Sequence, residues 1–388
     1  MTEQSQDVSG RHAAGARRTQ RRSRPSAVRV ALRVLGALVS TVMFVLSGYA
    51  WYNYSTLNRN LNTVAVVGLG SSGAPSGAPT ATDTGAAQNL LLVGLDSRAG
   101  LSSAEKRRLH LGQDDLSIST DTIVLVHIPA NGQKATLVSI PRDSWVHIPG
   151  FQPDKINAAY ADGCCNQEDA ISPKDAQQKG ASKLVSVVKA LTGVEIDQYV
   201  QIGFAGFEEV VKAIGTVPVN LCQSVSDRYS GFSMTAGRHN LTARQALAFV
   251  RQRHNIPGSL TDDYGREERQ RYFLRQAFSS IASADTLLNP VKLHRLIDAI
   301  DDAITFGNPN VDLAKFADQM SNLSAGNITG TSIPTHGSNA EYGLIVHPAE
   351  VRAKVRALFY PAPSTPSSTS PTSATSSNST PPKRSCVY

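Results

Sequence analysis

Three short apolar runs are the feature of this 388-residue chain that most constrains its fold. They read NLLLVGL (89–95), TIVLVHI (122–128) and KATLVSI (134–140). Their length and their content of β-branched residues are typical of buried β-strands. A late run at 328–333 looks like a further strand, and helical patterns occupy residues 172–191, 204–214, 241–249, 267–284, 290–304, 312–323 and 347–358. Strands interleaved with helices predict an α/β fold, with a central mixed β-sheet between helical layers.

Charged residues stand at one end of each apolar run: they are Asp96, Arg98, Asp121, Arg142 and Asp143. The third run stops at Pro141, which cannot donate a hydrogen bond to a central strand. A single charge pair here would indicate only a surface ion pair, worth about 0–1 kcal/mol. Because α/β sheets bind ligands at strand ends, three such coincidences favour a binding site.

A second group of polar side chains lies further along the chain. In VRQRH, Arg251 and Arg253 are two residues apart and share a side only where the backbone is extended. In GREERQ, Arg266 is followed by Arg269 and Gln270 at i+3 and i+4, on one helix face. Lys155 adds another cation. The alternative for this group is a solvated basic face.

Clustered guanidinium groups repel one another, so their arrangement implies an anion with several oxygens, and the bidentate fork matches phosphate or pyrophosphate. Carboxylates in such a site would repel that anion unless a hard cation lies between them. We therefore expect Mg²⁺, or Mn²⁺, with Asp96 and Asp121 as ligands. Phosphoryl transfer needs these components. The GxSxG, HExxH and GxxxxGK[ST] motifs are absent, which disfavours other chemistries.

The N-terminal region predicts a membrane anchor. Residues 34–52 hold 19 residues without a charge, close to the roughly 20 that span a bilayer. A cleaved signal peptide or a buried core helix are alternatives, but aromatic residues at 49–54 are typical of a membrane interface. Eight arginines in residues 1–33 carry most of the net charge of +7 and place the N-terminus in the cytoplasm. Since the rest of the chain is nearly neutral, no nucleic-acid partner is expected.

These patterns divide the chain into a cytoplasmic basic tail (1–33), a transmembrane helix (34–54), an extracellular catalytic domain (55–360) and a disordered Ser/Thr/Pro-rich tail (361–388). Residues 68–88 predict a flexible loop within the domain. In an oxidising compartment, Cys222 is expected to pair with Cys164 or Cys165, and the sequence leaves this choice open.

The motifs NLLLVGLDSR, STDTIVLVHI, VSIPRDSWVHIPG, DKINAAYADG and AFVRQRHNIPGSLTDDYGREERQRYFL occur in this order between about Leu57 and Leu358. Together they resemble the LytR-CpsA-Psr (LCP) family of Gram-positive cell-wall enzymes, and the Ala/Arg/Ser bias agrees with an actinobacterial member. The resemblance implies the LCP-type fold, in which the sheet and helices enclose an apolar tunnel for a polyprenyl chain. It also implies transfer of a glycopolymer from a polyprenyl-pyrophosphate carrier to a peptidoglycan hydroxyl, releasing polyprenyl phosphate, at the cell membrane.

The matching motifs imply a role for individual residues of this chain. Asp96 and Asp121 would be the Mg²⁺ ligands. The implied catalytic residues are Arg142, Asp143, Arg251 and Arg253, with Asp143 as a base or an orienting group. The implied pyrophosphate site comprises Arg98, Arg142, Lys155, Arg251, Arg253, Arg266, Arg269 and Gln270. In this interpretation, Pro141 ends the strand so that Arg142 points at the pyrophosphate.

Two positions depart from the family pattern. Ser119 stands where members often carry an arginine, so one phosphate contact is missing or replaced. Cys164 and Cys165 stand where small residues are common. Two other functions stay open on the sequence: a hydrolase that cleaves the lipid pyrophosphate with water, and a non-catalytic envelope-binding or regulatory protein.

Overall fold

The computed structural model of the chain describes residues 61–70, 87–98, 101–111, 118–130, 134–165, 172–254, 262–283, 286, 289–309, 311, 328–361 and 386–388, together with 40, 41, 43, 44, 47 and 48. The chain divides into two units, Met1–Ser55 and Thr56–Tyr388. The described residues of the first unit are helical, but most of the predicted span (34–54), the basic tail, most of the loop at 68–88 and the expected helix at 312–323 lie outside the described residues. No helix within the described ranges has both the length and the apolar character that crossing a bilayer requires.

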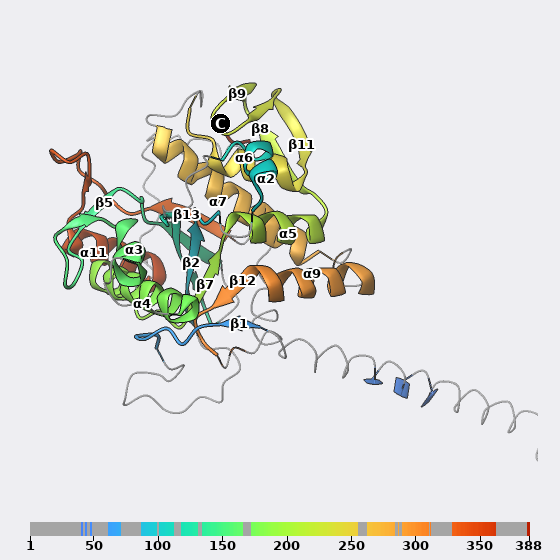
Figure 1. Cartoon of the computed structure of the whole chain (residues 1–388), viewed down its shortest axis with the longest axis horizontal. Coiled ribbons are helices and arrows are strands. Elements are labelled where there is room, and N and C mark those ends of the chain that lie inside the picture. Colours follow the sequence, from blue (N-terminus) through green and yellow to red (C-terminus); the bar gives the residue numbers. More distant parts are fainter. Residues whose placement is uncertain are drawn as a thin grey trace, which may run out of the picture. The chain divides into compact units, whose positions relative to one another are not determined.

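A mixed sheet of seven strands forms the centre of the second unit (Figure 1). Its strands lie in the order β1 (Asn62–Thr63), β12 (Ile304–Phe306), β7 (Gln198–Ile202), β2 (Gln88–Leu95), β3 (Thr120–Ile128), β4 (Ala135–Ser139) and β13 (Ile328–Ser332). β2 is parallel to β7 and antiparallel to β3, whereas β4 is antiparallel to β3 and parallel to β13. The predicted fold class is therefore confirmed, as are the strands expected from the three apolar runs.

Helices cover both faces of the sheet because its strands are apolar on both sides. Leu91 and Val138 point to one face, where they pack with residues of α3 (Ala158–Cys164), α4 (Pro173–Thr192) and α11 (Pro348–Phe359). Leu90 and Leu137, each one residue earlier, point to the other face and pack with residues of α7 (Asp262–Ile281) and α9 (Pro290–Ala303). Figure 1 shows these two helical layers on opposite sides of the strands, with α5 (Phe204–Ile214) and α6 (Ala243–Arg251) in the second layer.

Short elements complete the second unit. β8 (Val217–Leu221) pairs with β11 (Gly237–Leu241), β9 (Val225–Asp227) pairs with β10 (Phe232–Met234), and β5 (Ser144–Val146) lies between β14 (Leu344–Ile345) and β6 (Asp154–Lys155). The helix α2 (Ser103–Arg108) follows β2 and begins with a capping box of Ser102 and Glu105. In Figure 1, α2, β8, β9 and β11 lie above the sheet together with α6, whereas β5 lies at the left beside α3 and α11.

The last three residues of the chain correct two expectations. The predicted disordered tail includes Cys386–Tyr388, yet Val387 pairs with Leu221 of β8 and is only 2% exposed. Cys222 forms its disulfide with Cys386, and Cys164 forms one with Cys165, so the expected pairing of Cys222 with the vicinal cysteines is wrong. The reason is a long-range contact: Val387 pairs alongside β8 through two backbone hydrogen bonds and packs into an apolar core, which the average composition of the tail does not reveal.

Replacing Cys222 and Cys386 with serine should lower the free energy of unfolding by about 2–4 kcal/mol, because this disulfide removes the entropy of a long loop from the unfolded chain. The two cysteines are 164 positions apart in the sequence. Serines at Cys164 and Cys165, which are adjacent, are the matched control and should change stability little. Thermal unfolding with and without reductant measures both effects. Equal losses in the two double variants would contradict the loop-entropy explanation.

Candidate active site

The antiparallel pairing of three strands brings the predicted charged residues to one edge of the sheet. Asp96 follows the last residue of β2, and its backbone N–H donates to the carbonyl of Ser119, just before β3 (2.8 Å). β4 runs antiparallel to β3, so its end, and Arg142 just beyond it, reach the edge where β3 begins. Asp121 is the second residue of β3. The strand pattern read from the sequence therefore brings Asp96, Asp121 and Arg142 together.

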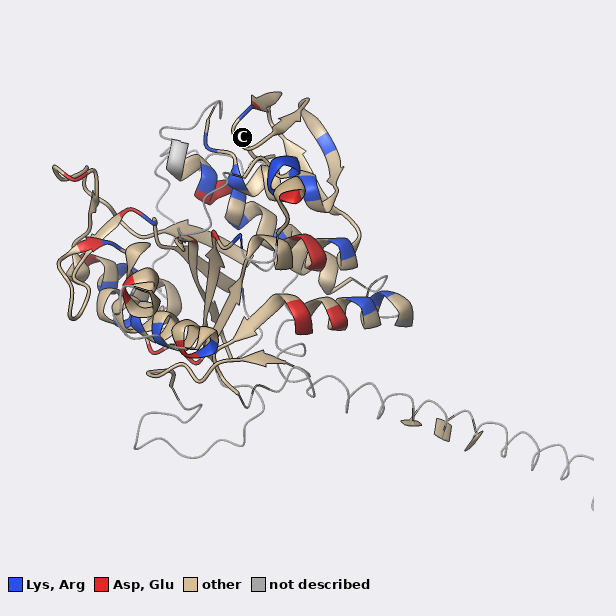
Figure 2. Cartoon of the chain, viewed as in Figure 1, with Lys and Arg blue, Asp and Glu red and all other residues tan. Residues whose placement is uncertain are grey.

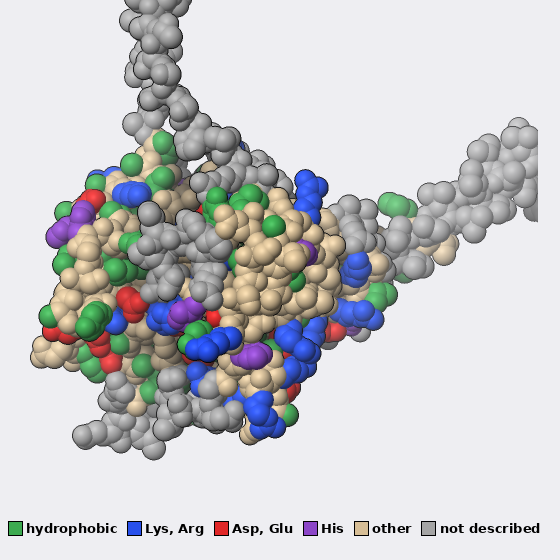
Figure 3. Space-filling model, turned by 90° about the horizontal axis from the view of Figure 1, so that it is seen from above, with side chains coloured by type: hydrophobic (Ala, Val, Ile, Leu, Met, Phe, Trp, Pro, Cys, Tyr) green, Lys and Arg blue, Asp and Glu red, His purple; other side chains and the backbone are tan. Residues whose placement is uncertain are grey.

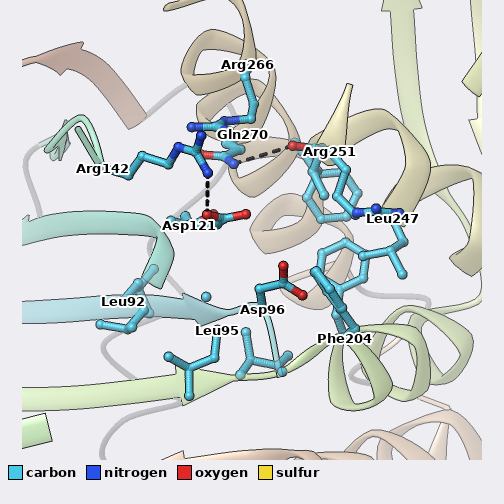
Figure 4. A pocket seen from close by; sticks show the side chains of 18 of the residues that line it. Leu92, Leu95, Asp96, Asp121, Arg142, Phe204, Leu247, Arg251, Arg266 and Gln270 are labelled. Atoms are coloured by element: carbon cyan, nitrogen blue, oxygen red, sulfur yellow. Dashed lines mark hydrogen bonds and ion pairs between the residues drawn. The ribbon is translucent and has the colours of Figure 1, made fainter. Parts of the chain in front are cut away.

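Ion pairs connect these side chains. Arg142 Nη1 lies 2.8 Å from Asp121 Oδ1 (Figure 4). On the other side, Arg142 Nε lies 3.5 Å from Asp143, which is also 3.6 Å from Lys155 Nζ. Asp143 and Lys155 do not line the adjoining cavity and instead support Arg142 from outside it. Arg98 is likewise outside the lining and forms a two-point contact with Asp96 (3.2 and 3.3 Å).

The end of α6 supplies the next two arginines. α6 ends at Arg251, and Gln252 adopts an extended conformation (φ −60°, ψ 129°). Arg251 and Arg253 therefore both line the cavity, while Gln252 between them is fully buried. This confirms the extended backbone that the VRQRH spacing predicted. Arg251 is held by hydrogen bonds to the carbonyls of Leu109 (2.8 Å) and His110 (3.3 Å).

Of the three α7 residues expected in the pyrophosphate site, Arg266, Arg269 and Gln270, only two line the cavity. Arg266 and Gln270 line the cavity, and Gln270 donates to the carbonyl of Val250 (3.4 Å). Arg269 does not line it: its guanidinium lies 5.0 Å from the ring centre of Phe249 and donates to the side chain of Gln252. At about 100° per residue, positions i+3 and i+4 diverge enough to face different neighbours. The structure thus corrects Arg269 from a substrate contact to a buried support behind Arg251 and Arg253.

Most of these charged residues line one cavity of about 470 Å³. Its mouth is polar: Asp96, Ser119, Asp121, Arg142, Arg251, Arg253, Arg266 and Gln270. Its interior is apolar, formed by residues of β2, β7, α5, α6 and α7: Leu92, Leu95, Val200, Ile202, Phe204, Phe207, Leu247, Val250, Phe273 and Leu274. Figure 4 shows Asp96 and Asp121 facing this space from the strand ends, opposite Arg251 and Arg266. The cavity can therefore hold a ligand with an anionic group and a hydrocarbon part.

Sequence reasoning did not name the apolar lining, although one signal was present. Phe204 and Phe207 are three residues apart in α5 and lie on one face of that helix. The sequence alone does not distinguish them from ordinary core residues, because only the tertiary structure shows that the space opposite them is open. Ser119, noted as a departure from the family pattern, lines the mouth with its hydroxyl 3.2 Å from Asp121 Oδ1.

The charges at the mouth favour an ionised Asp121. Burial alone would raise the pKa of this carboxyl, but the positive charges of Arg142, Arg266 and Arg253 outweigh it and hold the pKa below its usual value. Burial also lowers the pKa of Arg251. An anionic ligand at the mouth would therefore offset the desolvation of the Arg251 guanidinium.

Asp121 should make stability depend on pH in the acid range. Because the pKa of its carboxyl is lowered on folding from the ordinary value of 3.8, the ionised form contributes stability above that value, and the contribution disappears as pH falls through the folded pKa. The effect should be about 1 kcal/mol, since the pair is partly exposed. Urea unfolding from pH 7 to pH 3 should give a flatter profile for Asp121→Asn than for the wild type. Parallel profiles would contradict the ion pair.

The oxygen ligands of Asp96 and Asp121 suit Mg²⁺, which commonly binds through one or two carboxylates plus phosphate oxygens. Both carboxylates line the same cavity mouth. Within the described ranges, no group of three His, Cys, Asp or Glu side chains is placed to hold a metal ion. The two carboxylates fit as a partial coordination site.

Several solved structures share the fold of this chain. The chain is similar to the LytR-Csp2A-Psr enzyme from Actinomyces oris, with a TM-score of 0.52, 22% identity, and coverage of 76% of this chain and 95% of that one. It is also similar to TagV of Bacillus subtilis, with a TM-score of 0.53, 20% identity, and coverage of 72% of this chain and 99% of that one. At these identities, the likeness establishes the fold.

Sequence comparison identifies the family. Residues 60–356 match the LytR_cpsA_psr family. Cell wall biosynthesis protein LcpA of Corynebacterium glutamicum is 32% identical over 85% of this chain and 65% of its own length. The teichoic acid transferase TagU of Oceanobacillus iheyensis is 30% identical over 65% of this chain and 68% of its own length. The chain belongs to the LytR_cpsA_psr family, and it spans somewhat less than two thirds of LcpA.

Proposed function

We propose that the protein transfers a glycopolymer from a polyprenyl-pyrophosphate carrier to a hydroxyl of peptidoglycan and releases polyprenyl phosphate. The observation that carries this proposal is a single cavity with an apolar interior and a mouth of guanidinium groups and carboxylates. A lipid diphosphate has the matching chemistry, because its hydrocarbon tail gains from leaving water and its phosphates accept bidentate hydrogen bonds. Relatives named as cell-wall biosynthesis proteins and teichoic acid transferases support the same substrate class.

In this mechanism, the lipid tail occupies the apolar interior and the pyrophosphate lies among Arg142, Arg251 and Arg253. Arg266 and Gln270 complete the mouth from α7. Arg142 now pairs with Asp121, so on substrate binding its guanidinium would be shared with a phosphate oxygen. Asp143 and Lys155 orient Arg142. The structure thus supports Asp143 as an orienting group.

The acceptor hydroxyl oxygen attacks the phosphorus that carries the glycan. A new P–O bond forms, the P–O bond to the bridging oxygen breaks, and polyprenyl phosphate leaves with that electron pair. The arginines stabilise the negative charge that develops on the phosphate oxygens, a kind of contribution often worth several kcal/mol in the transition state. The hydroxyl proton must pass to a base or to solvent.

Asp96 and Asp121 would hold Mg²⁺, or Mn²⁺, with phosphate oxygens of the substrate completing the coordination. The bound ion would neutralise phosphate charge and so aid the displacement. This role is consistent with two carboxylates that line the same cavity mouth, because Mg²⁺ prefers carboxylate oxygens together with phosphate oxygens as ligands.

We further propose that the catalytic domain lies outside the cell membrane, attached by one N-terminal span whose own N-terminus is cytoplasmic. The arginine-rich segment before an uncharged stretch of 19 residues supports this topology. The disulfide between Cys222 and Cys386 supports it independently, because structural disulfides persist in oxidising compartments.

The test incubates the full chain in detergent with a polyprenyl-pyrophosphate glycan, peptidoglycan fragments and Mg²⁺, with parallel reactions in EDTA. Polyprenyl phosphate together with glycan on the peptidoglycan supports transfer. Free phosphoglycan, formed whether or not peptidoglycan is present, would show a hydrolase instead. Binding of the lipid without either product would show a non-catalytic protein, and full activity in EDTA would remove the metal from the mechanism.

A further inference from the structure

A second cavity, of about 290 Å³, lies directly beside the first. It is formed by the end of α2, the turn between β9 and β10, and the first two turns of α6. Leu247 lines both cavities, and Arg251, in the lining of the first, donates hydrogen bonds to the carbonyls of Leu109 and His110, which line the second. Leu247 and Arg251 therefore connect the linings of the two cavities.

One face of α6 links the two cavities. Arg244, Leu247 and Arg251 follow one another at i, i+3 and i+7, so they stand on the same side of the helix. At 1.5 Å rise per residue, Arg244 lies about 10 Å along the helix from Arg251. A group attached to a phosphate at Arg251 would therefore reach the second cavity within one or two sugar rings.

The second cavity presents groups that suit a hydroxylated ligand. Arg244 is exposed, and none of the described residues pairs with it. Arg108 also lines the cavity and pairs with Glu208 on α5 (3.2 Å). Ser233 and His110 add a hydroxyl and an imidazole to the lining. Figure 2 shows the basic last turn of α2. Figure 3 shows Lys and Arg side chains on the face that is seen from above. These groups can form hydrogen bonds with a saccharide from several sides of the cavity.

Two residues with positive φ angles, His110 and Gly231, form part of the wall of this cavity. His110 has a left-handed conformation (φ +53°), which is uncommon for a residue other than glycine. Gly231 (φ +72°) lies so close to the His110 ring that a β-carbon would be only 2.4 Å from it. Because Gly231 has no side chain, the β9–β10 turn can lie against His110 and close one wall of the cavity.

We propose that the second cavity binds the saccharide unit nearest the pyrophosphate of the lipid-linked donor, with Arg244 and His110 as binding residues. This rests on the proposed function, since it assumes a pyrophosphate at Arg251. It goes further by assigning a place to the glycan, in the second cavity beside Arg251 and Arg244, while the lipid tail occupies the apolar part of the first cavity.

The test measures affinities of the full chain in detergent for three ligands: a polyprenyl pyrophosphate without sugar, the same lipid carrying a saccharide, and a soluble peptidoglycan fragment. The variants are Arg244→Ala and His110→Asn; asparagine tolerates the left-handed backbone of position 110. The control is Arg238→Ala, on β11 and outside both cavity linings. Thermal unfolding checks that all variants are folded.

We expect each variant to weaken binding of the saccharide-bearing lipid by about 10-fold, the order of magnitude expected for losing one hydrogen bond to the ligand, and to leave the bare lipid within 2-fold of wild type. Weakening confined to the peptidoglycan fragment would overturn the assignment and make this an acceptor site. Equal weakening for both lipids, or none for any ligand, would overturn it too. If the wild type bound no lipid pyrophosphate at all, the proposed function itself would fail, and the two failures are therefore distinguishable.

Discussion

Replacing Arg142 with alanine should reduce glycopolymer transfer by about 10²–10³-fold, the range typical of removing one preorganised group that stabilises transition-state charge. Arg142 lies at the cavity mouth, is held by Asp121 and Asp143, and directs its guanidinium to where the pyrophosphate would lie (Figure 4). The measurement is the initial rate of polyprenyl phosphate release with peptidoglycan fragments as acceptor.

Two further variants separate catalysis from folding. Arg142→Lys keeps a charge that can pair with Asp121 but loses the planar fork, so we expect it to retain stability and still lose most activity. Arg238→Ala, on β11 away from the cavity mouth, should behave as wild type. If Arg142→Ala lowers the free energy of unfolding enough to account for its loss of activity, and Arg142→Lys is fully active, the arginine is structural.

Filling the apolar part of the cavity should abolish the higher affinity that we expect for long polyprenyl chains over short ones. Leu274, on α7, lines the interior and is only partly buried, so a tryptophan there would project into the cavity of about 470 Å³. At about 0.8 kcal/mol per buried carbon, excluding one five-carbon isoprene unit costs roughly 4 kcal/mol, or nearly 10³-fold in affinity. Affinity for polyprenyl pyrophosphates of increasing length measures this.

The matched control is Leu274→Met, a volume-conserving change that should alter affinity little. For Leu274→Trp, we expect short soluble analogues to bind as they do to the wild type, because they need only the arginines at the mouth. Wild-type affinity for long lipids in this variant would show that the tail lies elsewhere. Loss of affinity for short and long lipids alike would show a distorted site.

Local sequence patterns predicted most of the polar site because its parts are short-range features. Three apolar runs with charged residues at their ends predicted which side chains meet at the sheet edge, and the structure brings Asp96, Asp121 and Arg142 together there. The two-residue spacing of Arg251 and Arg253 predicted an extended segment after α6, which Gln252 adopts. Such inferences succeed because strand and helix periods are properties of the backbone itself.

Other features depended on contacts between distant segments. Arg269 directly precedes Gln270 on α7, yet it stacks on Phe249 and supports Gln252, because α6 packs against α7 at that position. The pairing of Cys222 with Cys386 joins β8 to the end of the chain, across a tail whose composition alone suggests disorder. No local pattern encodes either partner.

The sequence by itself determined the fold class, the strand ends that carry the charged groups and the family, since periodicity and motif order do not depend on how the elements pack. Only the tertiary structure decided that these groups line the mouth of an apolar cavity, that Arg269 supports the site from behind, and that a second cavity adjoins Arg251. A cavity is space left between elements that are distant in the chain, so its walls exist only once the sheet, α5, α6 and α7 have packed together.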